Sequence, residues 1–256
     1  MYMDTIRIMG ESAVNKANFL KRSVIKYLIS SAMAGMYVGF GIMLSFSVGA
    51  PFAAADSPAA KTIMGVSFGI ALSLVIFAGS ELFTGNSMVM AIGNLLNKVT
   101  LQDTVIIWIL SYMGNLMGSF LLAFLTVQSG LLSHPPQSEF ILTVAASKMN
   151  APAVQLFLRG ILCNMLVCLA IWSASRAKGD TAKLVLIWWC LYGFVGAGFE
   201  HSIANMSLLG MALFIPHDPT LVSIGGTIYN LAVVTAGNIV GGTFLVGITY
   251  WYISKD

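Results

Sequence analysis

The segment Glu81-Leu-Phe-Thr-Gly-Asn86 has a counterpart in Glu200-His-Ser-Ile-Ala-Asn205, 119 residues further along the chain. Both follow the pattern E-x4-N, and a methionine comes soon after each of them. Downstream, Gly114-Asn-Leu-Met-Gly118 matches Gly237-Asn-Ile-Val-Gly241 at a separation of 123 residues. Because two motifs recur in the same order at nearly the same separation, the sequence predicts a chain built from two related halves.

The composition around these motifs is that of a membrane protein. Hydrophobic residues make up 57% of the 256 residues and charged residues only 9%, whereas soluble domains carry about 25% charged residues. A lipid bilayer must therefore solvate most of the chain. This excludes a cytosolic enzyme, a nucleic-acid-binding protein and a secreted disulfide scaffold. The three cysteines lie in apolar runs without a C-x-x-C motif, which predicts buried thiols and neither a metal site nor a disulfide.

Long stretches with few or no charges mark the membrane crossings. A crossing helix needs about 20 residues to span roughly 30 Å of hydrocarbon. One stretch, 62–97, is too long for one straight crossing, and both it and 184–214 are interrupted by one of the two repeated glutamates. We therefore predict an all-α integral membrane protein with six transmembrane helices, of which the second and the fifth are broken. The predicted spans are 27–49, 62–97 (broken), 104–128, 153–175, 184–214 (broken) and 229–253.

Each half holds three of these spans. Because three is an odd number, the second half inserts upside down relative to the first, as in the inverted repeats of transporters and channels. We predict a single transmembrane domain over 1–256, with a first repeat at 27–128 and a second at 139–253. Residues 1–26 form a cytoplasmic N-terminal helix, whose apolar stripe we expect on the inner membrane surface or against a neighbouring subunit. The stripe consists of Ile6, Met9, Ala13, Ala17 and Leu20.

The distribution of lysine and arginine predicts the orientation. With the N-terminus inside, only Lys61 and Lys148 fall in the outer loops, and Arg159 lies near the outer end of the fourth span. The other ten cations then face the cytoplasm, which by the positive-inside rule places both termini there and the protein in the cytoplasmic membrane. These ten are Arg7, Lys16, Lys21, Arg22, Lys26, Lys98, Arg176, Lys178, Lys183 and Lys255.

The two breaks predict a polar site at membrane depth. Non-helical backbone is tolerated there only where it is buried in protein or lines a cavity. Each broken helix also presents a half-helix N-terminus, whose free amides and partial positive charge favour an anion. Two such ends that face each other would make an anion-binding site without a full buried cation.

These motifs also resemble those of a known family. Gly198-Phe-Glu-His-Ser-Ile-Ala-Asn-Met206, Glu81-Leu-Phe-Thr-Gly85, Gly160-Ile-Leu-Cys-Asn164 and Gly237-Asn238 are similar to the signatures of the formate/nitrite transporter family, over nearly the whole chain. Within the family the sequence is most similar to the hydrosulfide channel branch, and next to the nitrite channel branch. The resemblance implies an aquaporin-like six-helix subunit, a homopentamer with one anion pore in each protomer, and no cofactor or metal.

The resemblance also assigns roles to single residues. His201 and Thr84 match pore residues on the two broken loops, and Lys148 matches a lysine beside the outer vestibule. The matching pore-side or loop-supporting amides are Asn164 and Asn238. The residues that match the apolar constriction are Phe68, Leu72, Leu82, Phe83, Val167 and Phe194. Since a carboxylate repels anions, we expect Glu81 and Glu200, with Asn86 and Asn205, to support the loops.

Each role has a structural alternative. His201 could be a hydrogen-bonded core histidine that ties its loop, and Lys148 could be a solvated loop lysine. The aromatic and leucine side chains could be ordinary core packing. Arg159 we expect to be structural, reaching the outer interface with its guanidinium.

The expected mechanism combines electrostatics with proton chemistry. Burial in an apolar slit raises the pKa of a weak acid such as nitrous acid, formic acid or hydrogen sulfide. The anion can then take a proton, from water or relayed by His201, cross as the neutral acid and release the proton beyond. Histidine suits this relay because its ordinary pKa is about 6.5. We favour hydrosulfide as substrate, with nitrite or formate as alternatives. A channel for neutral solutes such as water, glycerol or ammonia is the competing function, and the sequence does not separate a passive channel from a proton-coupled carrier.

Overall fold

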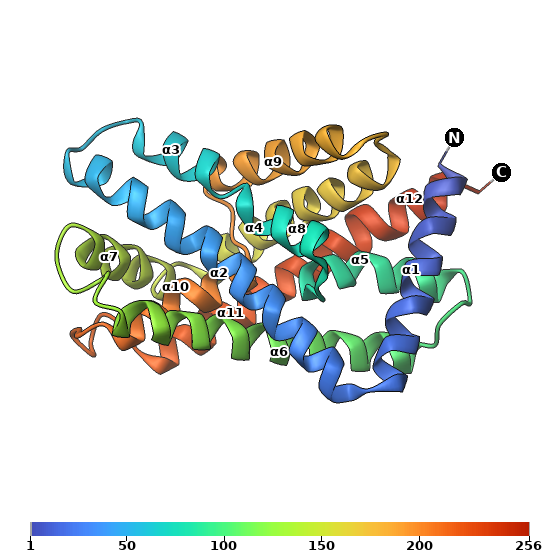
Figure 1. Cartoon of the computed structure of the whole chain (residues 1–256), viewed down its shortest axis with the longest axis horizontal. Helices are drawn as coiled ribbons and strands as arrows, with labels where there is room; N and C mark the ends of the chain where they lie inside the picture. The colour runs from blue at the N-terminus through green and yellow to red at the C-terminus, as the bar shows by residue number, and fades with distance from the viewer. Residues whose placement is uncertain (1, 256) are drawn as a thin grey trace.

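The computed structural model describes residues 2–255, and every regular element in that range is a helix. Five helices are long and apolar enough to cross a membrane, and a pair bent by 57° makes a sixth crossing. Figure 1 shows them as a bundle with both chain ends at the same end of the molecule. The elements are α1 (Met3–Arg22), α2 (Val24–Ala54), α3 (Ala60–Ser67), α4 (Ile70–Leu74), η1 (Val75–Gly79), α5 (Phe83–Leu95), α6 (Leu101–Gln128), α7 (Gln137–Met149), α8 (Ala153–Arg176), α9 (Asp180–Ala197), α10 (Ser202–Phe214), α11 (Ile224–Ile239), η2 (Val240–Ile248) and α12 (Thr249–Ile253).

The second and fifth crossings are broken, as the sequence predicts, and both breaks have the same cause. Gly79 and Gly198 have φ angles of +81° and +76°, a left-handed conformation that other residues adopt only with strain. Extended backbone follows each glycine, and a new helix begins at Phe83 and at Ser202. The breaks thus precede Thr84 and Asn86, which lie in the first turns of α5.

The two glycine–asparagine motifs hold equivalent helix pairs together. α6 packs along α2, and α11 packs along α8. A Cβ at Gly118 would collide with the carbonyl oxygen of Ala32 on α2, and a Cβ at Gly241 would collide with that of Ile161 on α8. Small residues allow membrane helices this close approach. The sequence repeat is therefore a repeat of helix contacts.

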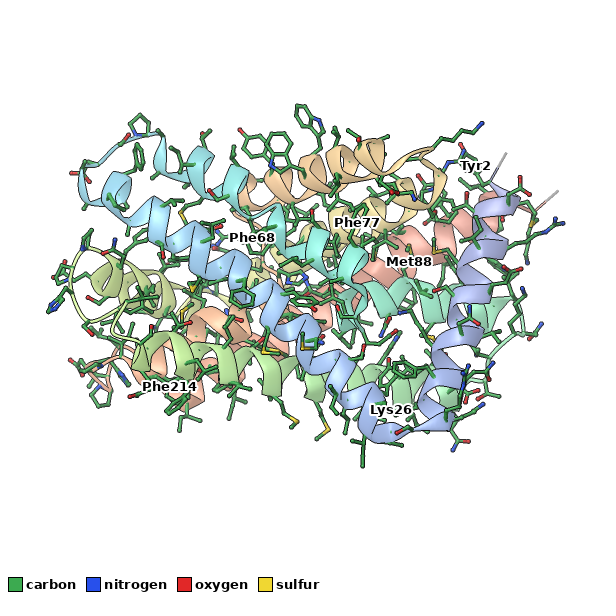
Figure 2. The ribbon with its side chains drawn as sticks, in the orientation of Figure 1. Tyr2, Lys26, Phe68, Phe77, Met88 and Phe214 are labelled. Carbon is green, nitrogen blue, oxygen red and sulfur yellow. The ribbon has the colours of Figure 1, made fainter. Side chains whose placement is uncertain are left out.

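The N-terminal helix does not lie where we expected it. Its stripe is buried against the same chain, mainly on α5, with Ile6 and Ala13 fully buried. A Cβ at Gly93 of α5 would collide with the side chain of Ala13, so the two helices approach closely. In Figure 2, Lys26 lies at the turn from α1 into α2, whereas Phe68 and Met88 point into the bundle. The apolar stripe is explained by α5, not by a membrane surface or a neighbouring subunit.

One helix was not predicted from the sequence, and several helices begin or end at other residues than predicted. α7 (Gln137–Met149) precedes the fourth crossing and carries Lys148, which we predicted to lie in an outer loop. α2 extends beyond the predicted 27–49 at both ends, and its N-terminal end is capped by Ser23, which accepts a hydrogen bond from the amide of Lys26. α11 begins at Ile224 rather than 229, with Ser223 as its cap.

Candidate functional site

The two breaks meet in the interior of the bundle. Thr84 Oγ1 lies 3.0 Å from His201 Nε2, and both side chains are buried. Thr84 is in the first turn of α5, and His201 directly precedes α10. The N-terminal ends of two half-helices, where backbone amides lack helical partners, therefore converge on one pair of side chains.

His201 is also the N-cap of α10. Its Nδ1 accepts a hydrogen bond from the amide of Ala204 at 3.1 Å. A nitrogen that accepts carries no hydrogen, so the neutral imidazole holds its proton on Nε2 and donates it to Thr84. Protonation of Nδ1 would break the cap and add positive charge at the positive end of α10. This geometry opposes the expected relay, in which His201 gains a proton.

Two asparagines fix the extended backbone at the breaks in the same way. Asn115 Oδ1 accepts from the amide of Phe83, and its Nδ2 donates to the carbonyl oxygens of Ser31 and Glu81. Asn238 Oδ1 accepts from the amide of Ser202, and its Nδ2 donates to the carbonyl oxygens of Gly160 and Glu200. One buried amide thus satisfies two backbone groups at each break and ties the break to a carbonyl oxygen of a neighbouring helix, α2 or α8. Of the pair, only Asn238 was among the predicted site residues.

A lysine–glutamate–asparagine cluster stands beside each break. Lys148 Nζ lies 2.7 Å from Glu200 Oε2, which also accepts from Asn205 Nδ2 at 2.7 Å. On the other side, Lys16 Nζ contacts both carboxylate oxygens of Glu81 at 2.8 and 2.9 Å.

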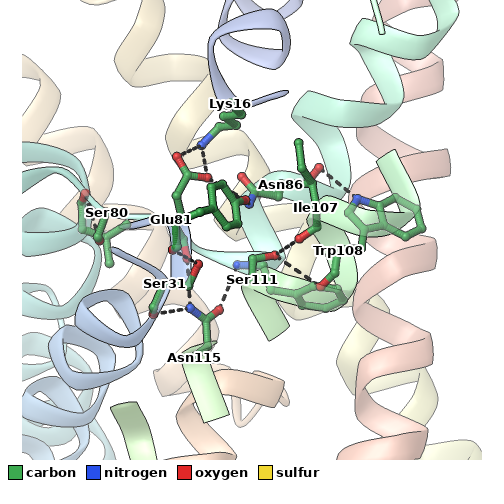
Figure 3. Close-up of polar contacts among 12 residues, drawn as sticks. Lys16, Ser31, Ser80, Glu81, Asn86, Ile107, Trp108, Ser111 and Asn115 are labelled. Carbon is green, nitrogen blue, oxygen red and sulfur yellow. Dashed lines mark hydrogen bonds and ion pairs between the residues drawn. The ribbon is translucent and has the colours of Figure 1, made fainter. Parts of the chain in front are cut away.

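Figure 3 shows the Lys16 cluster, in which Glu81 Oε2 also accepts from Tyr27 and from Asn86. The predicted supporting role of both glutamates agrees with this geometry. Lys16 was not predicted as a site residue. The two glutamates are 119 residues apart, but Lys16 and Lys148 are 132 residues apart. The spacing of the repeat therefore does not identify Lys16 as the counterpart of Lys148.

Three cavities that share lining residues lie along the bundle; His201 lines two of them, whereas Thr84 lines none and contacts His201 from outside the lining. One cavity, lined by Lys148 and here called the Lys148 cavity, has a volume of about 620 Å³. Another, lined by Lys16 and here called the Lys16 cavity, has a volume of about 590 Å³. Between them lies a slit of about 10 Å³, at the lower limit for one water molecule. Phe68, Phe194 and His201 line both the Lys148 cavity and the slit, and Leu82 lines both the slit and the Lys16 cavity.

Most of the predicted constriction is in this slit. Its described lining contains one polar side chain, His201, whose ring stacks on that of Phe194 with centroids 5.8 Å apart. The lining residues are Val38, Phe68, Ala71, Leu72, Leu82, Val167, Leu191, Phe194 and His201. Phe83 is an exception to the prediction: its ring packs on Tyr112, with centroids 5.1 Å apart, and it contributes its backbone amide.

The side-chain amide of Asn164 stabilises the backbone at Thr84 and at Asn238 by hydrogen bonds. Its Nδ2 donates to the carbonyl oxygens of Thr84 and Asn238 and to Ser87 Oγ, and neither Asn164 nor Asn238 lines a cavity. The sequence left two roles open for these amides, in the pore wall or in support of the loops, and the geometry favours support of the loops.

Lys148 is not a solvated loop lysine, because its side chain is 19% exposed and ion-paired. Arg159 is exposed and donates to Gln155. Over residues 2–255, no group of three histidine, cysteine or acidic side chains is placed to hold a metal.

Six crossings, two broken helices and a slit between two cavities define a membrane protein that passes small solutes. The family model for formate/nitrite transporters matches residues 3–252, and the chain belongs to this family of multi-pass membrane transporters and channels. It is 42% identical to the nitrite transporter NirC of Salmonella typhimurium, over 98% of this chain and 92% of that one.

Solved structures show the same architecture. A structure described as an FNT family ion channel has a TM-score of 0.94 and 40% identity, and the match covers 99% of this chain and all of the other. A pentameric formate channel with formate bound has a TM-score of 0.81 and 29% identity, over 91% and 98% of the two chains.

Proposed function

We propose that the protein conducts small monovalent anions of weak acids across the cytoplasmic membrane, with both termini in the cytoplasm. The names of its relatives support nitrite and formate, and hydrosulfide stays the prediction of the sequence resemblance. The pentameric formate channel supports a homopentamer with one pore in each protomer. In the proposed orientation the Lys148 cavity opens outward and the Lys16 cavity inward.

The observation that carries the proposal is the convergence of two half-helix N-termini on Thr84 and His201 beside the slit. Their partial positive charges favour an anion over a cation. Both lysine–glutamate pairs are internally neutral, so neither blocks an anion with a bare carboxylate. The arrangement thus attracts an anion to the centre without a buried cation that would hold it there.

The slit sets the form in which the solute crosses. Passage through about 10 Å³ of apolar space strips water from an anion, at a cost of several kcal/mol even after relaxation. A weak acid lowers this cost when it takes a proton and crosses in its neutral form. We assign the proton to water in the cavities, because Nδ1 of His201 is used as a cap. Thr84 accepts the Nε2–H, and His201 is the one polar side chain among the described residues that line the slit.

The test is a flux comparison in proteoliposomes. Initial rates of nitrite, formate and hydrosulfide uptake are measured between about pH 5 and 8, with glycerol and ammonia as neutral solutes. Protein-free liposomes correct for the acids that cross lipid unaided. We expect at least one of the three weak acids to enter far faster than through lipid alone, with a rate that follows its ionisation. Rapid glycerol or ammonia flux without any weak-acid flux would instead establish the neutral-solute channel.

A further inference from the structure

The two cavities differ in charge, although the repeats that form them are similar. Lys16 and Glu81 both line the Lys16 cavity and neutralise each other at 2.8 Å. The Lys148 cavity contains two lysines, Lys61 and Lys148, and no acidic residue is among the described residues that line it. The charge of Lys148 is balanced by Glu200 at 2.7 Å. Lys61 is therefore an additional positive charge at one mouth only.

Lys61 is placed to act on a solute before it enters. It lies in the first turn of α3, is exposed and lines the Lys148 cavity. In the described part of the chain its ammonium has neither an ion-pair partner nor a hydrogen-bond partner. The carboxylate nearest in sequence, Asp56, is not among the lining residues.

The field of a single charge extends further than that of an ion pair. The potentials of Lys148 and Glu200 largely cancel a few ångströms away, whereas that of Lys61 is limited only by solvent and salt. The Debye length is about 10 Å at 0.1 M salt, so the potential of Lys61 reaches beyond its own contacts. Charges that line a cleft raise the local concentration of an oppositely charged solute and its association rate.

We propose that Lys61 is the residue that captures anions at the mouth of the Lys148 cavity, and that Lys148 acts inside as a member of its ion pair. This inference rests on the proposed function, since it concerns the entry of the same anions. It predicts an asymmetry in the effect of salt: an impermeant salt on the Lys148 side screens Lys61 and weakens anion entry, whereas the same salt on the Lys16 side does not.

The test uses the full-length protein in right-side-out membrane vesicles, with nitrite and then formate as probes. Initial uptake is measured against anion concentration at low and high ionic strength, with a large impermeant anion as the added salt. For Lys61→Gln we expect KM to rise about two- to tenfold at low salt, with an unchanged maximal rate. High salt should raise the KM of the wild type towards that of the variant and leave the variant itself almost unaffected. Because flux through a passive pore is reversible, the ratio of maximal rate to KM for efflux should fall by the same factor in Lys61→Gln, and salt added inside the vesicles should leave uptake unaffected.

Two variants serve as controls. Lys61→Arg keeps the charge and should retain the KM of the wild type. Lys178→Gln removes a positive charge from the exposed loop between α8 and α9, away from all three cavities, and should change nothing. An unchanged KM in Lys61→Gln at low salt, or a rise that persists at high salt, would overturn the role of Lys61 while wild-type flux still supports the proposed function. A wild type that carries none of nitrite, formate and hydrosulfide would overturn both.

Discussion

Lys148 Nζ and Glu200 Oε2 lie 2.7 Å apart, with 19% and 4% of the two side chains exposed. The pair joins α7 to the break before α10. A helix outside the six crossings therefore stabilises the break in the fifth crossing through an ion pair. Lys16 of α1 does the same for the second crossing through Glu81. The inverted repeat thus includes a helix that precedes each group of three crossings.

Removal of one member of the Lys148–Glu200 pair should destabilise the protein. Lys148→Met leaves a buried carboxylate without its cation, and we expect a loss of about 3 kcal/mol in unfolding free energy. The double variant Lys148→Met with Glu200→Gln should recover most of this loss, because no charge then stays buried. Thermal unfolding in detergent measures both.

The control for this experiment is Lys183→Met. Lys183 pairs with Asp180 at the surface, where the side chains are 35% and 75% exposed. A loss below about 1 kcal/mol is expected there. A double variant as unstable as Lys148→Met alone would show that the aliphatic stem of Lys148, and not its charge, stabilises the loop.

The loop asparagines should be equally sensitive to an isosteric change. In Asn238→Asp the carboxylate still accepts from the amide of Ser202, but it faces the carbonyl oxygens of Gly160 and Glu200 without a donor. We expect a loss of about 2 kcal/mol or more, and a similar loss for Asn115→Asp. Asn150→Asp, at an exposed site, is the matched control. A large effect at only one of the two buried sites would contradict the equivalence of the breaks.

The sequence predicted the crossings and the breaks because both depend on local patterns. Charge-free runs, the glutamates at the repeat and the glycines before them are all visible in the chain. The slit residues came from the family resemblance, since Phe68, Leu72, Leu82, Val167 and Phe194 have no pattern that separates them from core packing.

Long-range contacts are the part that the sequence did not reveal. Lys16 was counted only as a cytoplasmic cation, because nothing local shows that α1 crosses α5 and reaches Glu81. Asn115 was seen as half of a motif, but its bonds to three backbone groups depend on how α2, α5 and α6 meet. The apolar residues of 6–20 were predicted to share one stripe, but the stripe packs on α5 and not on either of the two partners expected for it.

A smaller side chain in the slit should relax the size limit. Leu82 lines both the slit and the Lys16 cavity, so Leu82→Ala opens the narrow part towards one side. We expect the ratio of acetate to formate flux in proteoliposomes to rise severalfold. Leu156→Ala removes the same atoms from a buried leucine that lines none of the three cavities, and should leave the ratio unchanged. Equal ratios in wild type and Leu82→Ala would mean that this leucine only packs.

The role of His201 can be decided by a variant that keeps the cap. Asparagine is a good N-cap residue, so His201→Asn retains an acceptor for the amide of Ala204 but has no titratable ring. If the proton comes from water, flux in this variant should follow pH as it does in the wild type, because the substrate's own ionisation sets the profile.

The two profiles are compared between about pH 5 and 8, after each is scaled to its maximal rate. His201→Ala removes the cap as well, and should lower stability by about 1 kcal/mol, which separates the loop function of the residue from its pore function. A wild-type profile with an additional rise in flux below about pH 6.5 that His201→Asn lacks would show that the imidazole does take up a proton. The cap would then have to open during transport, and the relay predicted from the sequence would replace the assignment made from the structure.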